Sequence, residues 1–434
     1  MEPLMGSIEH DGSPAKINLK NYFNLYPEIR LFIDKAEAQA LGDDYSRIYS
    51  TTYDVSECSS NIKYKTVMYG NAGSLTCELV HENCQRLFHT GDRIRLYLDG
   101  RCWFCGTIFI TDYKDSTNMT ITAYDFLRYF KSQLVYGKNK LMNEDGTAGM
   151  VASDIFMKIC QDLKLPFDIY ANSSIPVTPQ NYQLKSAFNI LEFAINQTVV
   201  NSDIDNRKYY MYFHETYFPD DENKTMSETE VFKTGGRVVW ALRNNLTVDT
   251  VIDDNMIYDY NFKESIDEQT YNEIIVYKNQ KTYLSKTGKT SKNGKKTGTD
   301  YRGLVTDKKL LNEARQKRAL YGYLPYYQKA PDGFTLGQMQ QVANELQKMY
   351  LKPTHSLSLN CYGIIGMRAG YLVPVLIQDI GGTHIGKQVK DEKTGQYILK
   401  PVYRTVTECE MVVEHPLKMN LQISCFMGDE DVVG

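Results

Sequence analysis

The stretch GDRIRLYLDGRCWFCGTIFITDYK, Gly91 to Lys114, decides the fold of the first part of the chain. Every second residue from Ile94 to Leu98 is aliphatic, which places these side chains on one face of a strand. Asp99-Gly100 is a dipeptide typical of two-residue hairpin turns, and the residues after it form a second apolar run. The stretch therefore predicts an antiparallel β-hairpin.

The same stretch contains Cys102 and Cys105, which have the Cys-x-x-Cys spacing of redox centres and zinc sites. In an extended strand their Cα atoms lie about 10 Å apart, at about 3.3 Å per residue, and their side chains point to opposite faces. A disulfide tolerates at most about 7 Å between Cα atoms, and no second Cys-x-x-Cys is present to complete a zinc site. We therefore expect two free thiols, one facing inward and one outward.

Short alternating runs separated by Gly, Asn and Asp extend from about Tyr26 to Phe130. Among them, TNMTITAYDF, Thr117 to Phe126, predicts a third strand. Tyrosine occurs 33 times and tryptophan only 2 times, and the tyrosines lie mostly in alternating or β-branched contexts that favour sheet. A meandering antiparallel sheet hides its edges most easily by curling into a barrel or a sandwich.

Bulk composition restricts the possible functions of the chain. It carries 49 Lys and Arg against 53 Asp and Glu, so it has no global positive field for nucleic acid or an anionic membrane. The start, MEPLMGSIEHDGSPAK, has no basic flank leading into an apolar run, and no window of about twenty apolar residues follows it. Nine scattered cysteines are unlike a disulfide framework. We expect a soluble globular protein with reduced thiols that is made and folded in a cytoplasm.

From about Gly146 to Asp254 the apolar residues change to helical spacing. The pattern predicts helices within Thr147–Pro166 and Ser186–Gln197, with Ser186 as the cap of the second. Strand-like segments follow at Arg207–Phe218 and Gly236–Leu242. This part of the chain is expected to be a small mixed α/β domain.

From about Tyr258 the β pattern returns, and it is interrupted by a helix predicted at Thr335–Tyr350, where Thr335 and Gln338 have capping-box spacing. The fold class is therefore expected to be mainly β (α+β). The expected domains are an N-terminal arm at 1–25, a first β domain at 26–140, an inserted α/β domain at 141–255, and a second β domain at 256–430 with a helical insertion at about 305–352.

The segment GGTHIGK, Gly381 to Lys387, matches the Gly-x-x-x-x-Gly-Lys pattern of phosphate loops. A phosphate loop also needs Ser or Thr after the Lys and a helix after the loop, but Gln388 follows here. The next residues, VKDEKTGQYILK, Val389 to Lys400, have the pattern of a hairpin. We interpret the segment as a β-turn and not as a nucleotide site.

The sequence supports no active site. His214-Glu215 lacks the second His of a zinc-helix motif, and no two histidines stand four residues apart. PDDEN, Pro219 to Asn223, lacks calcium-loop spacing, and no Gly-x-Ser-x-Gly elbow occurs. We assign no catalytic, cofactor-binding or metal-binding residues, and we expect no cofactor.

The segment from Lys281 to Asp300 carries six lysines and no acid until its last residue. It is interpreted as a solvated insertion rich in Gly, Ser and Thr, with a basic finger for nucleic acid or for an acidic partner as the alternative. We hypothesise that Lys281–Lys296 lies at the periphery of an assembly or contacts a neighbouring protein.

The stretch Gly91–Gly137 combines a Gly-Asp strand start, a hairpin, an aromatic-rich strand running into Gly, a polar loop, and an alternating strand into AYDFLRYF. In this it resembles the baseplate hub proteins of contractile phage tails and phage-tail-like bacteriocins, the XkdQ-type tail-hub family. Gly366–Gly382 and Val406–Cys425 resemble the second β unit of that family. The similarity extends from about residue 26 to 427 through diffuse patterns and not through catalytic signatures.

The resemblance implies two tail-tube-like antiparallel β-barrels in each chain and a homotrimer around a central channel. Such a ring of six barrels joins the hexameric tail tube to the trimeric central spike. The implied partners are the tail tube protein, the central spike protein, other baseplate or wedge proteins and possibly the tape measure, with no membrane insertion and with nucleic acid at most transient in the channel. The implied role is structural and not enzymatic, in the tail baseplate of a virion or a bacteriocin particle.

Two other functions remain open from the sequence. A carbohydrate- or receptor-binding β module of a phage tail would use the tyrosine-rich strands for sugar stacking. An enzyme of unrecognised type is the other alternative, although no motif in the sequence supports it.

Overall fold

The computed structural model describes residues 22–424, except for 43, 69–71, 83, 116, 143–145, 147, 170–171, 174–175, 180, 202–208, 215–236, 243–246, 268–269, 280–298, 331–334, 352–353, 381–382 and 391–394. The chain divides into two compact units. The main unit contains the chain up to Asn261 and Leu357–Ser424, and the small unit contains Phe262–Ser356.

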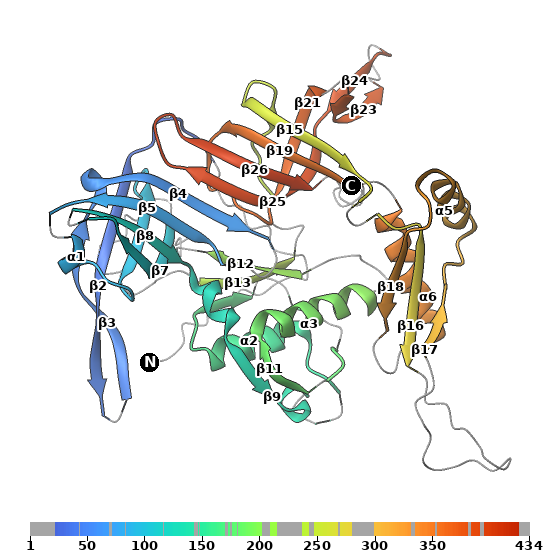
Figure 1. The fold of residues 1–434 in the computed structure, drawn as a ribbon, viewed down its shortest axis with the longest axis horizontal. Helices are drawn as coiled ribbons and strands as arrows, with labels where there is room; N and C mark the ends of the chain where they lie inside the picture. Colours follow the sequence, from blue (N-terminus) through green and yellow to red (C-terminus); the bar gives the residue numbers. More distant parts are fainter. Residues whose placement is uncertain are drawn as a thin grey trace. The chain divides into compact units, whose positions relative to one another are not determined.

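One 14-stranded sheet dominates the described residues (Figure 1). Three of its strands attach beside the main path: β21 (Leu372–Ile380) pairs with β25, β14 (Ile252–Asp253) and β22 (Thr383–Ile385). The strands of the main path follow one another in this order: β15 (Ile257–Ser265), β19 (Thr354–Tyr362), β26 (Lys418–Ser424), β25 (Val402–Val412), β4 (Ser59–Val67), β5 (Ser74–Val80), β8 (Asn118–Tyr124), β7 (Arg101–Tyr113), β6 (Arg93–Leu98), β2 (Ile29–Leu41) and β3 (Asp44–Asp54).

The mainly β fold class is confirmed, but the two closed barrels are not. The path of the sheet ends at β15 and β3, and among the described strands these two do not pair with each other. We call the sheet strands from β2 to β8 the first β segment and those from β14 to β26 the second β segment. The first β segment does not close on itself, because its strand β4 pairs with β25 of the second β segment. A free edge of one β segment is therefore satisfied by the other segment of the same chain.

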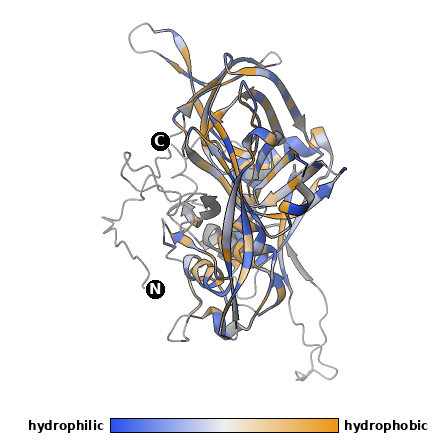
Figure 2. Cartoon of the chain, turned by 90° about the vertical axis from the view of Figure 1, so that its left-hand side faces the viewer, coloured by the Kyte–Doolittle hydropathy of each residue, from blue (hydrophilic) through white to orange (hydrophobic). Residues whose placement is uncertain are grey.

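The hairpin expected at Gly91–Lys114 is confirmed. β6 and β7 are antiparallel, and Leu98 pairs with Arg101 across the two-residue turn. Asp99 and Gly100 have φ values of 50° and 73°, the positive values that such turns need to match the twist of the strands. Residues of high and low hydropathy alternate along the strands (Figure 2). The buried aliphatic residues of β2, β5 and β6 are Leu31, Ile33, Leu75, Leu79, Ile94, Leu96 and Leu98.

A β-bulge changes the register inside this hairpin. Leu96 pairs with Phe104, whereas the next residue, Tyr97, pairs with Cys102. Trp103 is therefore an extra residue on β7, and the alternation of faces is interrupted at this point.

The bulge places the two cysteines on the same face. Cys102 pairs with Tyr97 and Cys105 pairs with Arg95, and these partners stand two residues apart on β6. Neither cysteine is in a disulfide, and both are buried. The expectation of a strand was right, but the expectation of one inward and one outward cysteine was wrong, because period-two alternation does not continue through a bulge.

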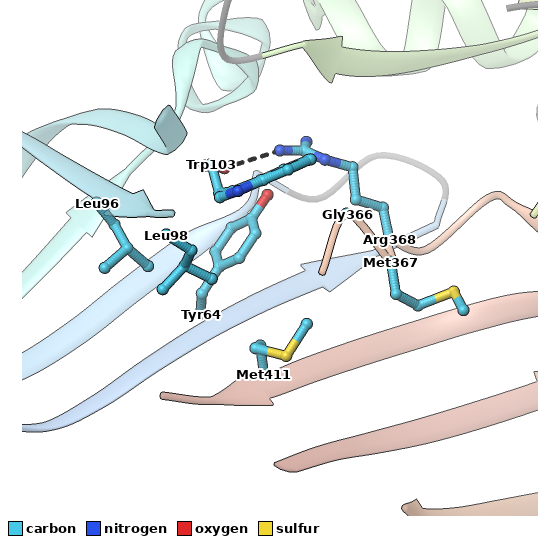
Figure 3. A pocket seen from close by; sticks show the side chains of 8 residues that line it. All are labelled: Tyr64, Leu96, Leu98, Trp103, Gly366, Met367, Arg368 and Met411. Atoms are coloured by element: carbon cyan, nitrogen blue, oxygen red, sulfur yellow. Dashed lines mark hydrogen bonds between the residues drawn. The ribbon is translucent and has the colours of Figure 1, made fainter. Parts of the chain in front are cut away.

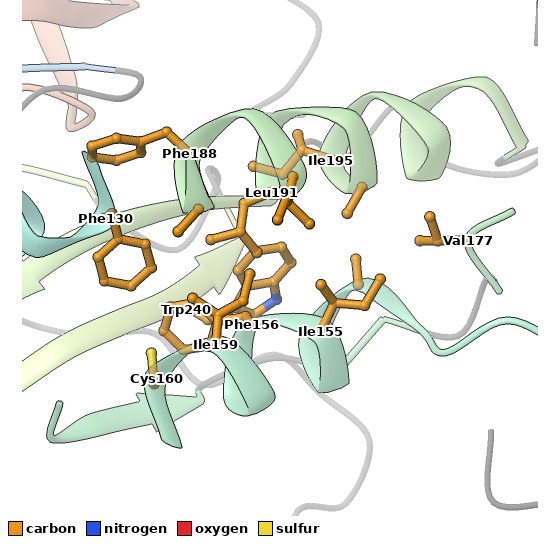
Figure 4. Packing of buried hydrophobic residues seen from close by; sticks show 14 of the residues in the cluster. Phe130, Ile155, Phe156, Ile159, Cys160, Val177, Phe188, Leu191, Ile195 and Trp240 are labelled. Carbon is orange, nitrogen blue, oxygen red and sulfur yellow. The ribbon is translucent and has the colours of Figure 1, made fainter. Parts of the chain in front are cut away.

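The α/β part contains the two helices expected from the sequence, α2 (Ala152–Asp162) and α3 (Ala187–Asn201). The Ser186 hydroxyl accepts a hydrogen bond from the Asn189 amide at 3.3 Å, which confirms the cap. The helices pack with Trp240, whose ring centroid lies 5.3 Å from that of Phe156 on α2 (Figure 4). A three-stranded sheet completes this part, in the order β10 (Phe167–Ile169), β13 (Arg237–Leu242) and β12 (Tyr209–His214).

In the small unit, β16 (Glu273–Asn279) lies between β17 (Thr299–Arg302) and β18 (Pro325–Lys329). Helix α5 (Lys308–Tyr321) precedes β18, and α6 (Leu336–Tyr350) follows it. The capping box of Thr335 and Gln338 is confirmed. Tyr326 stacks with Tyr271 and Tyr350 at centroid distances of 4.9 and 5.1 Å, so several tyrosines of this unit are packing residues.

Smaller elements complete the described fold. They are the helices α1 (Cys84–Leu87), η1 (Ser56–Cys58), η2 (Phe126–Lys131) and η3 (Lys138–Leu141), and the strand pairs β1 (Tyr22–Phe23) with β20 (Ile364–Ile365), β9 (Gln133–Tyr136) with β11 (Tyr182–Ser186), and β23 (Lys387–Lys390) with β24 (Tyr397–Lys400).

Candidate functional site: the seam between two β segments

The most distinctive polar structure of the main unit lies where β4 pairs with β25, a junction that we call the seam. Thr66 pairs with Cys409 and Tyr64 with Met411, so residues more than 340 positions apart share one ladder. Lys65 and Glu408 form an ion pair across the seam at 2.5 Å. The seam joins the first and second β segments into one continuous sheet.

A five-residue loop, Gly366–Gly370, closes over the seam, and we call it the seam loop. Its end residues have φ values of 90° and 92°, a backbone region that favours glycine. The amide of Gly370 donates to the Val406 carbonyl at 2.7 Å, and the amide of Ala369 donates to the Thr66 hydroxyl at 2.9 Å. The loop is therefore bonded to both strands of the seam.

Arg368, in the middle of the seam loop, is 5% exposed. Its Nη2 donates to the Trp103 carbonyl at 3.0 Å, at the bulge of β7, and its guanidinium carbon lies 5.5 Å from the Tyr64 ring centroid (Figure 3). A small cavity beside it is lined mostly by apolar side chains, including Met367 and Met411. Arg368 thus connects the second β segment to the hairpin that defines the first.

Asp125 is a second buried charged group near Arg368. Its carboxylate accepts hydrogen bonds from the amides of Gly73 at 2.9 Å and Leu127 at 3.0 Å. Burial raises the pKa of Asp125 to about 7, although the Gly73 amide and the Arg368 charge act in the opposite direction. A Cβ on Gly73 would lie 2.6 Å from the Asp125 Oδ2, so the close approach requires glycine.

Asp34 is the centre of a third buried polar group, on the same face of the first β segment as the two cysteines. Its carboxylate accepts from Arg93 Nε at 2.6 Å, from Arg95 Nε and Nη2 at 2.7 Å each, and from the Thr52 hydroxyl at 2.7 Å. Burial opposes ionisation of Asp34, but the hydrogen bond from Arg95 and the charges of both arginines outweigh it and lower the pKa of Asp34. These bonds compensate the buried charge of Asp34 and link the strands β2, β3 and β6.

The Cys-x-x-Cys pair does not have the chemistry of a reactive dithiol. Burial raises the pKa of the Cys102 thiol above its usual range, and the charges of Arg95 and Arg93 only partly oppose this. Thiolate is the reactive form of cysteine, so Cys102 is expected to be inert at neutral pH.

The phosphate-loop pattern lies on strands. Thr383–Ile385 form β22 and Lys387 begins β23, while Gly381 and Gly382 lie outside the described residues. The hairpin expected after it is confirmed, since β23 and β24 are antiparallel with Lys387 opposite Lys400. Without a helix after the glycines, this segment lacks the amide cradle of a phosphate loop.

Other sequence candidates lie partly or wholly outside the described residues. These are Lys281–Lys296, Pro219–Asn223, Glu215, and the side chain of His214. Within the described ranges, no three side chains of His, Cys, Asp or Glu gather in a way that could hold a metal ion. No helix in the described part of the chain is long and apolar enough to cross a membrane.

Sequence reasoning did not find Asp34, Asp125 or Arg368. Each is a charged residue next to apolar or alternating residues, and the signal is only that a charge stands where a buried residue is expected. Key partners lie far away in the sequence, since Gly73 is 52 residues from Asp125 and Trp103 is 265 residues from Arg368, so no local pattern reveals them.

Comparison with known proteins gives one family match and several similar folds. A family model described as YQBQ-like matches residues 62–394. No curated protein matches the chain. The 43 kDa tail protein of prophage MuSo2 from Shewanella oneidensis is 10% identical, with a TM-score of 0.49 over 92% of this chain and 97% of that chain.

Two further solved structures have comparable similarity. A tail protein from Neisseria meningitidis MC58 is 10% identical, with a TM-score of 0.49 over 93% of this chain and 98% of that chain. The prophage tail protein gp18 from Listeria monocytogenes EGD-e is 9% identical, with a TM-score of 0.43 over 91% and 94% of the two chains.

Proposed function

The chain belongs to the YQBQ-like family, and from this premise we propose that it is the structural hub of a contractile-tail baseplate. The matched range includes Gly91–Gly137, the segment that resembles the XkdQ-type tail-hub family. The proposed hub is a homotrimeric ring that joins the hexameric tail tube to the trimeric central spike in a phage tail or a tail-like injection particle.

The seam is the observation that carries this proposal. A hub that bridges sixfold and threefold partners needs two β segments per chain in a fixed relation, so that three chains present six segments. Pairing of β4 with β25, the Lys65–Glu408 ion pair and the bonds of the seam loop provide such a fixed relation. The division into β, α/β and β domains at 26–140, 141–255 and 256–430 is part of the same proposal.

The polar groups of the main unit support a structural role over an enzymatic one. Asp34 is saturated by two arginines and a threonine, and the Asp125 carboxylate is directed at backbone amides. Groups used in this way stabilise a fold and do not converge on a space that a substrate could enter. In this proposal, the chain is made in the bacterial cytoplasm and functions in the assembled baseplate.

Co-expression with the tail tube and central spike proteins of the same particle tests this function. The proposal expects a complex in which three copies of this chain accompany one trimeric spike and one tube ring, visible by electron microscopy of the purified complex. If the chain co-purifies with neither protein under conditions in which tube and spike are themselves folded, the hub function is wrong.

A further inference from the structure

The hairpin of β23 and β24, which we call the basic ribbon, is a largely exposed element of the main unit. Its two strands pair only with each other among the described strands. Tyr397 is 72% exposed and Ile398 is 42% exposed. An isolated two-stranded hairpin is at best marginally stable in water, so a ribbon with exposed apolar side chains gains stability when a partner covers it.

The charges of the basic ribbon are arranged unfavourably for an isolated element. Lys387 stands directly opposite Lys400, and Lys390 stands opposite Tyr397. Like charges opposite each other destabilise a strand pair. All three lysines are exposed, and the described residues offer none of them an acidic partner within ion-pair distance. The arrangement becomes favourable when carboxylates of another surface approach the ribbon.

A surface of that kind is present on the chain itself. The segment Thr247–Asn261, which we call the acidic segment, contains four aspartates and no lysine or arginine: Asp249, Asp253, Asp254 and Asp259. It includes β14 and the start of β15, the terminal strand of the sheet path. Tyr258 and Tyr260 on this strand are 49% and 43% exposed.

The hydrogen bonds that three of these aspartates accept do not neutralise them. Asp254 accepts from the Gln378 amide at 3.1 Å, Asp259 accepts from Asn360 Nδ2 at 3.0 Å, and Asp253 accepts from the Asn255 amide at 3.0 Å. All three donors are neutral groups. The acidic segment therefore presents negative charge and exposed tyrosines, the complement of the positive charge and exposed apolar side chains of the basic ribbon.

We propose that the basic ribbon of one copy docks on the acidic segment of a second copy. This inference rests on the proposed trimer and assigns residues to its subunit interface. A cyclic ring needs two different complementary surfaces on each subunit, and the ribbon and the acidic segment are such a pair. Lysine–aspartate contacts supply charge complementarity, and Tyr397 and Ile398 cover the tyrosines of β15.

Charge reversal with rescue tests the inference by sedimentation velocity over a concentration series. The first variant is Lys387→Glu with Lys400→Glu, the second is Asp249→Lys with Asp259→Lys, and the third combines all four changes. Lys131→Glu with Lys185→Glu is the matched control, because both lysines are exposed in the main unit. Thermal unfolding at a concentration where each protein is monomeric checks that the variants fold.

The inference expects each double variant to weaken self-association by at least about 10-fold, and the combination to regain most of that loss. The control should associate like the wild type, and added salt should weaken wild-type association. If the variant Lys387→Glu with Lys400→Glu associates as strongly as the wild type, the ribbon interface is wrong, but the proposed trimer still stands. A wild-type chain that stays monomeric at every concentration, alone and with the spike and tube proteins, overturns the ring itself.

Three other results overturn the inference. Failure of the combined variant to recover association means that the ribbon does not meet the acidic segment. A lowered unfolding temperature with unchanged association means that the contact is made within one chain. The third result concerns a DNA duplex. If the wild type binds the duplex, and Lys387→Glu with Lys400→Glu abolishes this binding without changing the mass of the oligomer, the ribbon binds a polyanion.

Discussion

Asp125 gives the fold a predictable response to pH. Burial raises its pKa from 3.8 to about 7, so the folded state binds this proton more tightly than the unfolded state. The stability from this group is complete below about pH 3.8 and is lost as the pH rises through about 7. When the pH is raised from 5.5 to 8, we expect the loss of this contribution to lower the free energy of unfolding by about 2 kcal/mol.

Urea unfolding of the wild type and Asp125→Asn at both pH values measures this contribution. The variant cannot titrate, so its unfolding free energy should lack this part of the change between pH 5.5 and pH 8. Equal pH dependence of the two proteins would show that Asp125 does not titrate in this range.

Asp34 responds in the opposite direction. Its pKa is lowered, so its contribution to stability is present above about pH 3.8 and is lost as the pH falls through the folded value. Asp34→Asn leaves Arg93 and Arg95 buried without their carboxylate and should cost about 3–5 kcal/mol at pH 7. Chemical denaturation measures the loss, and Asp112→Asn, on an exposed side chain, is the control and should cost little.

The hairpin around these residues shows what can be predicted at this scale. Alternation from Ile94 to Leu98 and the Asp99-Gly100 turn predict the hairpin correctly. The faces of Cys102 and Cys105 were predicted wrongly, because the extra residue Trp103 reverses the alternation. Nothing in the local sequence marks that bulge, which is stabilised by distant packing and by the hydrogen bond of Arg368 to the Trp103 carbonyl.

At the scale of elements, the seam loop connects the two β segments mainly through Arg368. Arg368→Ala removes the hydrogen bond to the Trp103 carbonyl and the contact with the Tyr64 ring, and should cost about 2–4 kcal/mol. It should also raise the pKa of Asp125 further, because the Arg368 charge lowers it in the wild type. Denaturation at several pH values reports both effects, and Arg86→Ala, on an exposed side chain, should change neither.

Helix α6 begins with a capping box that can be tested separately. The Thr335 hydroxyl accepts from the Gln338 amide at 3.3 Å, and the Gln338 side chain accepts from the Thr335 amide at 2.8 Å. Thr335→Ala should destabilise the small unit by about 1 kcal/mol. Hydrogen exchange of α6 and β16 should detect the loss, while Gln341→Ala, at an exposed position of the same helix, should leave exchange unchanged.

Elements that depend on local patterns were predictable. The helices α2, α3 and α6 and the strands β6, β7 and β8 coincide with their periodic segments. The seam was not predictable, because pairing of β4 with β25 depends on which distant edge is free and not on any local spacing. The position of Arg368 was not predictable for the same reason, because its hydrogen-bond acceptor Trp103 lies 265 residues away in the sequence.

At the scale of the whole chain, the sequence predicted a mainly β protein, and the structure confirms this class. Closure into two separate barrels was a wrong expectation, because composition and periodicity specify strands but not which edges meet. An open path that ends at β15 and β3 leaves strand edges that further chains can cover. In the proposed hub, further chains cover these edges.

The proposed hub function requires that three copies of the chain form one ring. Native mass measurement of the purified full chain, by mass photometry over a range of concentrations, tests it most directly. We expect a species of three times the 49.9 kDa monomer, which persists in the presence of the spike protein. A protein that remains monomeric at every concentration, alone and with the spike and tube proteins, would contradict it.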